Sequence, residues 1–147
     1  MGIRVNPEVQ RLLNERKLVK AQISRDMISK EIAAAESDLS DATDSLQSNK
    51  FKWATIQGYY SMFHSARALL YSKGFREKSH FALFLALRAI FSKEIEDSLI
   101  RQFEECMSLR QEADYGLSFS ENGALEAING AEKMLAKSKQ ILKLGDA

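Results

Sequence analysis

The chain has 147 residues, of which 45% are hydrophobic and 28% charged, with a formal net charge of +1. This length and composition are typical of a single globular domain. The near-zero net charge argues against a protein whose whole surface is basic for nucleic-acid binding, although a local basic patch is compatible with it.

The single cysteine, Cys106, cannot form an intramolecular disulfide, so we expect a reducing compartment. Its position in an apolar helical pattern favours a small core side chain over a nucleophile. No apolar run reaches the roughly 18 residues that a membrane span needs. The first residues lack the apolar centre of a signal peptide. We therefore expect a cytoplasmic protein with no membrane contact.

Apolar residues recur at steps of three and four along most of the chain. There are only seven glycines and one proline, and no stretch alternates convincingly at period two. The sequence predicts an all-α protein, an up-and-down helical bundle of five to six helices that forms one domain over residues 1–147.

The first helix is expected to begin at Asn6 and Pro7, because Asn can cap a helix and Pro fits its first position. Val9, Leu12, Val19 and Ile23 would mark one face, which makes 1–23 an additional N-terminal helix. Ser24 could cap a second helix, or the first helix could continue through it.

A narrow apolar seam runs along the second helix, from Met27 to Leu46. The opposite face is acidic, which indicates either a solvated face or a docking surface for a basic partner; it carries Glu31, Glu36, Asp38, Asp41 and Asp44.

The remaining helix boundaries follow from turn and capping signals. A turn at 48–50 precedes a third helix over 51–72, which ends at Lys73 and Gly74. A fourth helix opens at 78–80, and a weak break near 92–93 separates it from a fifth, which ends near 114–116. The pattern Ser118–Glu121 fits a capping box that opens the last helix.

The third helix has apolar or small residues on two opposite faces, so we expect it to be the central helix of the bundle. One face is large and aromatic: Trp53, Ile56, Tyr59, Tyr60, Phe63, Ala66 and Leu70. The other is small: Ala54, Gly58, Ser61, Ser65, Ala68 and Ser72. If no helix of the same chain covers the small residues, they suit a dimer interface.

Tyr60, His64, Arg67 and Tyr71 share a strip of this helix. Because a buried guanidinium needs a carboxylate or carbonyl partner, Glu112 and Asp114 are the expected partners of Arg67. The strip is interpreted either as a structural tie or as a pocket for a phosphate or a base.

The segment 73–80 places Arg76, Lys78 and His80 beside a helix start, where backbone N–H groups also attract anions. It is the strongest candidate anion-binding segment, although His80 could equally satisfy the helix terminus. Two histidines without matching ligand spacing favour no metal site. With no nucleotide-binding or hydrolase motif of known spacing, we expect no cofactor.

The segment KWATIQGYYSMFHSARALLYSKGFREKSH, residues 52–80, resembles the signature helix pair of the HEPN superfamily (higher eukaryotes and prokaryotes nucleotide-binding domain). LRQEADYG at 109–116 and the last helix are similar to its small stand-alone archaeal and bacterial branch. The resemblance covers about residues 23–142. It implies a helical bundle that is often dimeric and often encoded beside a minimal nucleotidyltransferase.

Many members of this superfamily are metal-independent endoribonucleases with an R-x(4–6)-H motif, whose Arg and His act across a dimer cleft. Here the matching segment is Arg110-Gln-Glu-Ala-Asp-Tyr115, and no His follows it within reach. Arg76 and His80 are too close together and precede a different helix. Tyr is a poor substitute for the imidazole as a proton shuttle near neutral pH.

Three hypotheses therefore remain. The favoured one is a non-catalytic module that binds a nucleotide, RNA or a protein through Tyr60, His64, Arg67, Arg76, Lys78 and His80. It would form a homodimer, with a minimal nucleotidyltransferase as partner in a toxin–antitoxin-like system. The second is a divergent endoribonuclease that uses Arg110 with Asp114, Tyr115 or His80. The third is a purely structural helical dimer.

Overall fold

Six α-helices and one small two-stranded antiparallel ribbon make up the fold, which a computed structural model describes for residues 6–144. The helices are α1 (Pro7–Asn14), α2 (Arg25–Gln47), α3 (Phe51–Ser72), α4 (His80–Phe91), α5 (Asp97–Gln111) and α6 (Glu121–Leu142). A π-helical turn, η1 (Glu112–Gly116), follows α5, and β1 (Leu18–Lys20) pairs with β2 (Phe75–Glu77). The expected all-α bundle is confirmed.

Side-chain caps fix most helix starts. Asn6 and Ser24 accept hydrogen bonds from backbone N–H groups of α1 and α2, as their sequences predict, and Ser79 does the same for α4. The expected capping box at Ser118 is wrong. Ser120 caps α6 instead, accepting from the N–H of Gly123.

The expected helix over 7–23 is also wrong beyond Asn14. Arg16 adopts a left-handed conformation with φ of 57°, which reverses the chain. Residues 18–20 then form β1, whose Val19 lies opposite Arg76 of β2 in an antiparallel pair. Each strand is too short to show an alternating pattern, and its backbone groups are satisfied only by the other strand, far away in the sequence.

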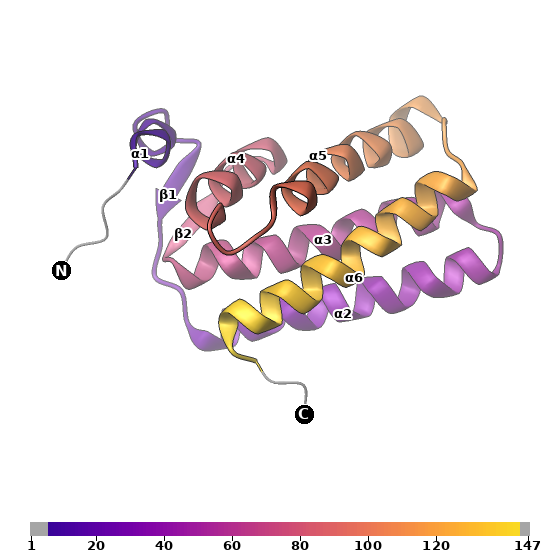
Figure 1. The fold of residues 1–147 in the computed structure, drawn as a ribbon, viewed down its shortest axis with the longest axis horizontal. Coiled ribbons are helices and arrows are strands. Elements are labelled where there is room, and N and C mark those ends of the chain that lie inside the picture. The colour runs from indigo at the N-terminus through magenta and orange to yellow at the C-terminus, as the bar shows by residue number, and fades with distance from the viewer. Residues whose placement is uncertain (1–5, 145–147) are drawn as a thin grey trace.

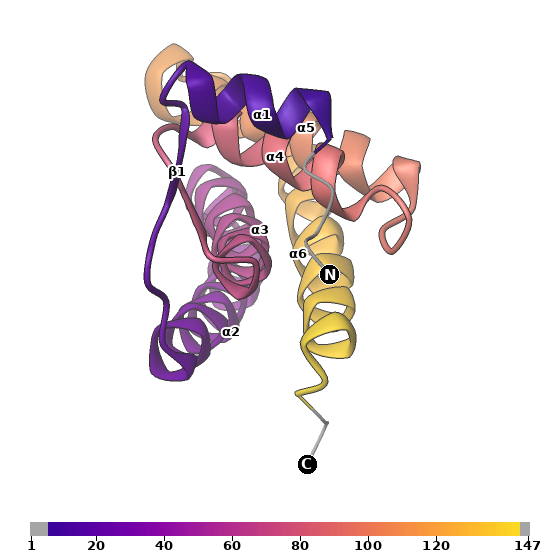
Figure 2. The same ribbon diagram turned by 90° about the vertical axis from the view of Figure 1, so that its left-hand side faces the viewer.

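The four longest helices, α2, α3, α5 and α6, run up and down. α2 and α3 are antiparallel, and Ser61 Oγ donates to the carbonyl of Ala35 at 2.7 Å. α5 is antiparallel to α6, while α3 and α6 run in the same direction (Figure 1). α4 connects α3 to α5 and lies with α1 in the layer above α3 (Figure 2).

α3 is the central helix, as expected, and its small face is covered within the chain. A Cβ added at Gly58 would lie 2.9 Å from the Cβ of Ala127 on α6, and Ser138 donates to the carbonyl of Ser65. The small residues therefore provide close packing of α2 and α6 against α3 rather than a dimer interface. Among these small residues, only Ser72, at the end of the helix, is exposed.

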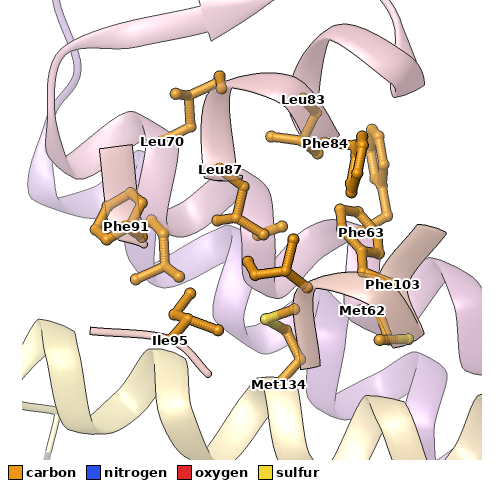
Figure 3. Close-up of a cluster of buried hydrophobic side chains, with 14 of the residues drawn as sticks. Met62, Phe63, Leu70, Leu83, Phe84, Leu87, Phe91, Ile95, Phe103 and Met134 are labelled. Carbon is orange, nitrogen blue, oxygen red and sulfur yellow. The ribbon is translucent and has the colours of Figure 1, made fainter. Parts of the chain in front are cut away.

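The large face of α3 enters the main core, where Phe63 lies near Phe84 and Met62 (Figure 3). Trp53 is an exception, because 50% of its surface is exposed near the beginning of the helix, where Lys52 lies over its ring. Cys106 is a buried core residue, as expected. Burial raises the pKa of its thiol to about 12, and the nearby Glu126 and Glu105 add to the effect. Among residues 6–144, no helix is long and apolar enough to cross a membrane.

Candidate functional site

Arg110, in the last turn of α5, is only 6% exposed although its side chain is charged. Its guanidinium carbon lies 5.3 Å from the ring centroid of Tyr59, 5.6 Å from that of Tyr60 and 6.0 Å from that of Tyr115. These are cation–π distances. Three aromatic rings thus surround one cation.

Within residues 6–144, Arg110 makes few polar contacts. Its Nε is buried and has no hydrogen-bond partner within residues 6–144. The only ion pair found there for this guanidinium, to Asp114 Oδ2, is long at 3.8 Å. A buried polar group without a partner costs free energy, and more so when it is charged. The site therefore holds donors suited to an incoming anion.

Asp114 and Tyr115 belong to the π-helical turn η1, which continues α5 shortly after Arg110. Tyr115 is 75% exposed, and Leu117, directly after the turn, has a left-handed φ of 56°. Such π turns and strained residues are frequent at functional sites. The turn presents an exposed tyrosine ring directly beside the buried guanidinium.

His80, the first residue of α4, joins the same cluster. Its Nδ1 lies 2.7 Å from the hydroxyl of Tyr59, and its ring stacks on Phe63 with centroids 4.4 Å apart. Burial lowers the pKa of His80, and Arg110 and Arg67 lower it further, while Glu77 opposes them. Burial also raises the pKa of Tyr59 well above its ordinary value, against the effect of Arg110. Both groups are therefore uncharged at neutral pH.

The expected pairing of Arg67 with Glu112 or Asp114 is wrong. Arg67 donates from Nε and Nη2 to Glu77 Oε2, at 2.9 and 2.6 Å, and from Nη1 to Glu31 at 3.0 Å. The guanidinium also lies 4.4 Å from the ring centroid of Phe63. Arg67 lies in the second half of the central helix, so the beginning of α2 and the end of β2, rather than the end of α5, come within its reach.

His64 takes part in the same ion cluster. Its Nδ1 lies 3.1 Å from Glu31 and its Nε2 lies 3.6 Å from Asp38. Burial alone would raise the pKa of Glu31, but hydrogen bonds from His64 and Arg67 outweigh it and hold this pKa below its ordinary value. Burial raises the pKa of Asp38, against the attraction of His64. Part of the acidic face of α2 is thus occupied within the chain.

Arg76 and Lys78 lie apart from Arg110. Both are exposed, and the guanidinium carbon of Arg76 is 5.7 Å from the ring centroid of Tyr71. The segment 73–80 contains β2, and Lys78 donates its backbone N–H to the carbonyl of Lys17. The contacts of these two residues are thus made with Tyr71 and with the chain next to β1, and not with Arg110.

The structure therefore brings together Arg110, Tyr60 and His80, with Asp114 and Tyr115 at the rim. Three partners were not predicted from the sequence: Tyr59 for His80, and Glu31 and Glu77 for Arg67. Tyr59 lies among large residues on the apolar face of α3, so its position did not indicate a polar role. Glu77 follows Arg67 by only ten positions, but the orientation of its side chain depends on strand β2, which no sequence pattern predicted.

Comparison with known proteins defines the class. The model of the HEPN domain matches residues 28–142, which is most of the bundle from α2 to α6. The chain therefore belongs to the HEPN family.

Several archaeal proteins are similar to this chain. "Putative toxin MJ0605" of Methanocaldococcus jannaschii is 33% identical over 132 residues, which cover 85% of this chain and 98% of the relative. "Putative toxin MJ0142" of the same organism is 30% identical and covers 67% of this chain and 68% of the relative. A UPF0332 protein of Archaeoglobus fulgidus is 27% identical and covers 74% of this chain and 89% of its own length.

A solved structure shares the fold. The crystal structure of TT1696 from Thermus thermophilus superposes with a TM-score of 0.68 at 17% identity. It covers 77% of this chain and 96% of TT1696. At this identity, the likeness concerns the architecture of the bundle.

Proposed function

We propose that this chain is a toxin-like HEPN protein that binds RNA or a nucleotide by placing a phosphate at Arg110. The observation that carries the proposal is the buried guanidinium whose Nε has no hydrogen-bond partner within residues 6–144. Arg presents a planar fork of donors that matches a phosphate. Two relatives that bear the name toxin support the role.

The aromatic side chains give the same site a surface for bases. Tyr60 is partly exposed and Tyr115 largely so, and both rings adjoin Arg110. Bases stack on such rings with little regard to sequence, while an arginine nearby binds the phosphate. Arg67 and His64 are already paired with carboxylates, which makes them weaker candidates for an anion than Arg110. Arg76 and Lys78 would contribute only long-range attraction.

The proposal includes a homodimer. Five of the large hydrophobic residues that are exposed lie on the first turn of α3, in the segment from η1 to α6, or on the first turns of α6: Trp53, Tyr115, Leu117, Phe119 and Leu125. Exposed apolar surface of this kind is typical of protein interfaces. A minimal nucleotidyltransferase is the proposed further partner. It is motivated by the family resemblance and by the exposed carboxylates Asp41 and Asp44 on α2, which a basic partner would suit.

Metal-independent RNA cleavage is the second candidate function, and the position of His80 favours it. The imidazole is neutral at pH 7, because its pKa is lowered. It adjoins the ring of Tyr59, and Arg110 adjoins the same ring. A general base and a phosphate-binding group therefore lie close together. The family's usual histidine is absent after Arg110, and His80 would take its place from another helix. Cleavage of RNA in the presence of a chelator, lost in both R110A and H80A, would establish this activity.

A binding titration tests the primary proposal. A labelled single-stranded RNA is titrated with the wild type, with R110A and with R110K at several salt concentrations. Loss of one charged phosphate contact should weaken binding about 10- to 100-fold, with partial retention in R110K and a shallower salt dependence in R110A. R101A is the matched control, because Arg101 is an exposed arginine of the same helix.

The outcomes separate the hypotheses. Equal weakening in R110A and R101A would refute a site at Arg110. If the folded wild type neither binds nor cleaves RNA or nucleotides, and R67A only lowers the melting temperature, the chain is a structural helical module.

A further inference from the structure

The imidazole of His80 lies among charges contributed by three elements. Arg110 approaches from α5, Arg67 from α3 and Glu77 from β2, while Tyr59 and Tyr60 contribute the adjoining rings. Two positive groups thus oppose protonation of His80 and one carboxylate favours it. Burial opposes protonation most strongly, so removing the influence of one guanidinium would weaken this opposition without reversing it.

The two ring nitrogens of His80 differ in their surroundings. Nδ1 is paired with the hydroxyl of Tyr59 at 2.7 Å, whereas Nε2 has no hydrogen-bond partner within residues 6–144. A neutral imidazole carries one N–H, and an imidazolium carries two. Uptake of a proton would therefore give the site a second charged donor, and the oxygen of Tyr59 can accept from Nδ1–H.

An anion bound at Arg110 would provide the missing stabilisation of the imidazolium. Its negative charge offsets the guanidinium that opposes protonation and adds an attraction of its own. The carboxylate of Glu77, whose Oε1 is buried without a hydrogen-bond partner in the described chain, acts in the same direction. When a ligand favours one protonation state, the proton must in turn favour the ligand.

We propose that binding of a phosphodiester at Arg110 is coupled to the uptake of a proton by His80, which makes the imidazolium a second ligand of the phosphate. The inference rests on the proposed function, because it requires the anion at Arg110. The proton comes from the solvent, and no covalent bond other than N–H forms. Tyr59 positions the ring, and in the imidazolium its hydroxyl oxygen accepts from Nδ1–H.

Calorimetry measures this proton directly. The probe is a 2′-O-methyl oligouridylate without terminal phosphates, which cannot be cleaved by attack of a 2′-hydroxyl and has no group that titrates near neutral pH. Binding heats are compared at about pH 6.5 in two buffers of different ionisation enthalpy. We expect uptake of a substantial fraction of about one proton, and an affinity that rises by at most about tenfold per pH unit as the pH falls.

Two variants locate the proton. H80Q should still bind through Arg110, but without proton uptake and with an affinity that no longer depends on pH. H64Q is the control and should retain the uptake, because His64 is paired with Glu31 and Asp38 in the separate ion cluster. In the unmodified protein, NMR titration of the His80 ring should give a higher pKa with the oligonucleotide than without it.

The results separate this inference from the function on which it rests. Binding with no proton uptake, or with equal uptake in the wild type and H80Q, would overturn the coupling alone. An unchanged His80 pKa in the saturated complex would do the same, even if H80Q failed to fold. Failure of the wild type to bind the oligonucleotide or an unmethylated RNA at low salt would overturn the proposed function and the coupling together.

Discussion

The hydroxyl of Tyr59 lies 2.7 Å from Nδ1 of His80, which joins the middle of the central helix α3 to the first residue of α4. Tyr59 is fully buried and its ring also adjoins Arg110. A single phenol therefore holds the imidazole next to the guanidinium. The candidate site depends on this contact more than on any local sequence motif.

Replacing Tyr59 by Phe should keep the packing of the ring and remove the hydrogen bond to His80. The free energy of unfolding should fall by about 1–2 kcal/mol, because a half-buried nitrogen loses its partner. Chemical denaturation measures this loss. Y60F is the control, since the hydroxyl of Tyr60 has no hydrogen bond within residues 6–144, and its effect should stay below about 0.5 kcal/mol. Equal effects would contradict the role assigned to Tyr59.

Replacing Arg67 by Ala should destabilise the fold by about 2–3 kcal/mol. The change leaves the mostly buried carboxylate of Glu77 without its partner, while solvent access to Arg67 reduces the cost below that of a fully buried pair. The comparison is K30A, which removes an exposed ion pair with Asp26 and should cost less than about 0.5 kcal/mol. Thermal and denaturant unfolding of the two variants measures the difference. Equal effects of R67A and K30A would show that the ion pairs of Arg67 stabilise the fold no more than an exposed pair does.

Gly58 should not tolerate a side chain. In G58A the new Cβ would meet the Cβ of Ala127 at 2.9 Å and its backbone carbon at 3.0 Å, so α3 and α6 must separate. Overpacking should cost about 1–3 kcal/mol, despite the better helix propensity of Ala. G116A has open space around the new methyl group and should leave the melting temperature nearly unchanged. A G58A protein as stable as the wild type would refute the close packing.

The free energy of unfolding of the free protein should depend on pH through the titration of His80. Its pKa is lower in the folded state than in the unfolded chain, chiefly because of burial, so the unfolded chain binds the proton more readily. The free energy of unfolding should therefore decrease as the pH falls below the ordinary histidine value of about 6.5, by less than about 1.4 kcal/mol per pH unit. Denaturation of H80Q at about pH 7 and about pH 5.5 should show a smaller decrease than the wild type. A larger decrease in H80Q than in the wild type would contradict a His80 pKa that is lowered by folding.

Much of the fold follows from periodic patterns and caps in the sequence. The bounds of α3 were predicted because its flanking turns at 48–50 and at Gly74 are distinct, and Gly74 has the left-handed φ of 80° that its position requires. The seam of α2 and the cap at Ser24 were equally clear. The pairing of β1 with β2 was not, because three-residue strands carry no periodic signal and their pairing is a property of the whole fold.

The candidate site was predicted only in part. The sequence identified three of its residues as candidates: Arg110, Tyr115 and His80. Their approach to one another depends on how α4 and α5 pack against α3. The partner of Arg67 was predicted wrongly, since helix spacing fixes which face a residue occupies and not which distant carboxylate reaches that face. Tyr59 had the pattern of an ordinary core residue.

NMR of the arginine Nε–H groups tests the central claim most directly, because it observes the atom that lacks a partner. Titration with a short single-stranded RNA should shift the Arg110 Nε–H signal strongly and protect it from exchange with water, while the signal of the exposed Arg101 stays nearly constant. An unchanged Arg110 signal in a saturated RNA complex would contradict phosphate binding at this site.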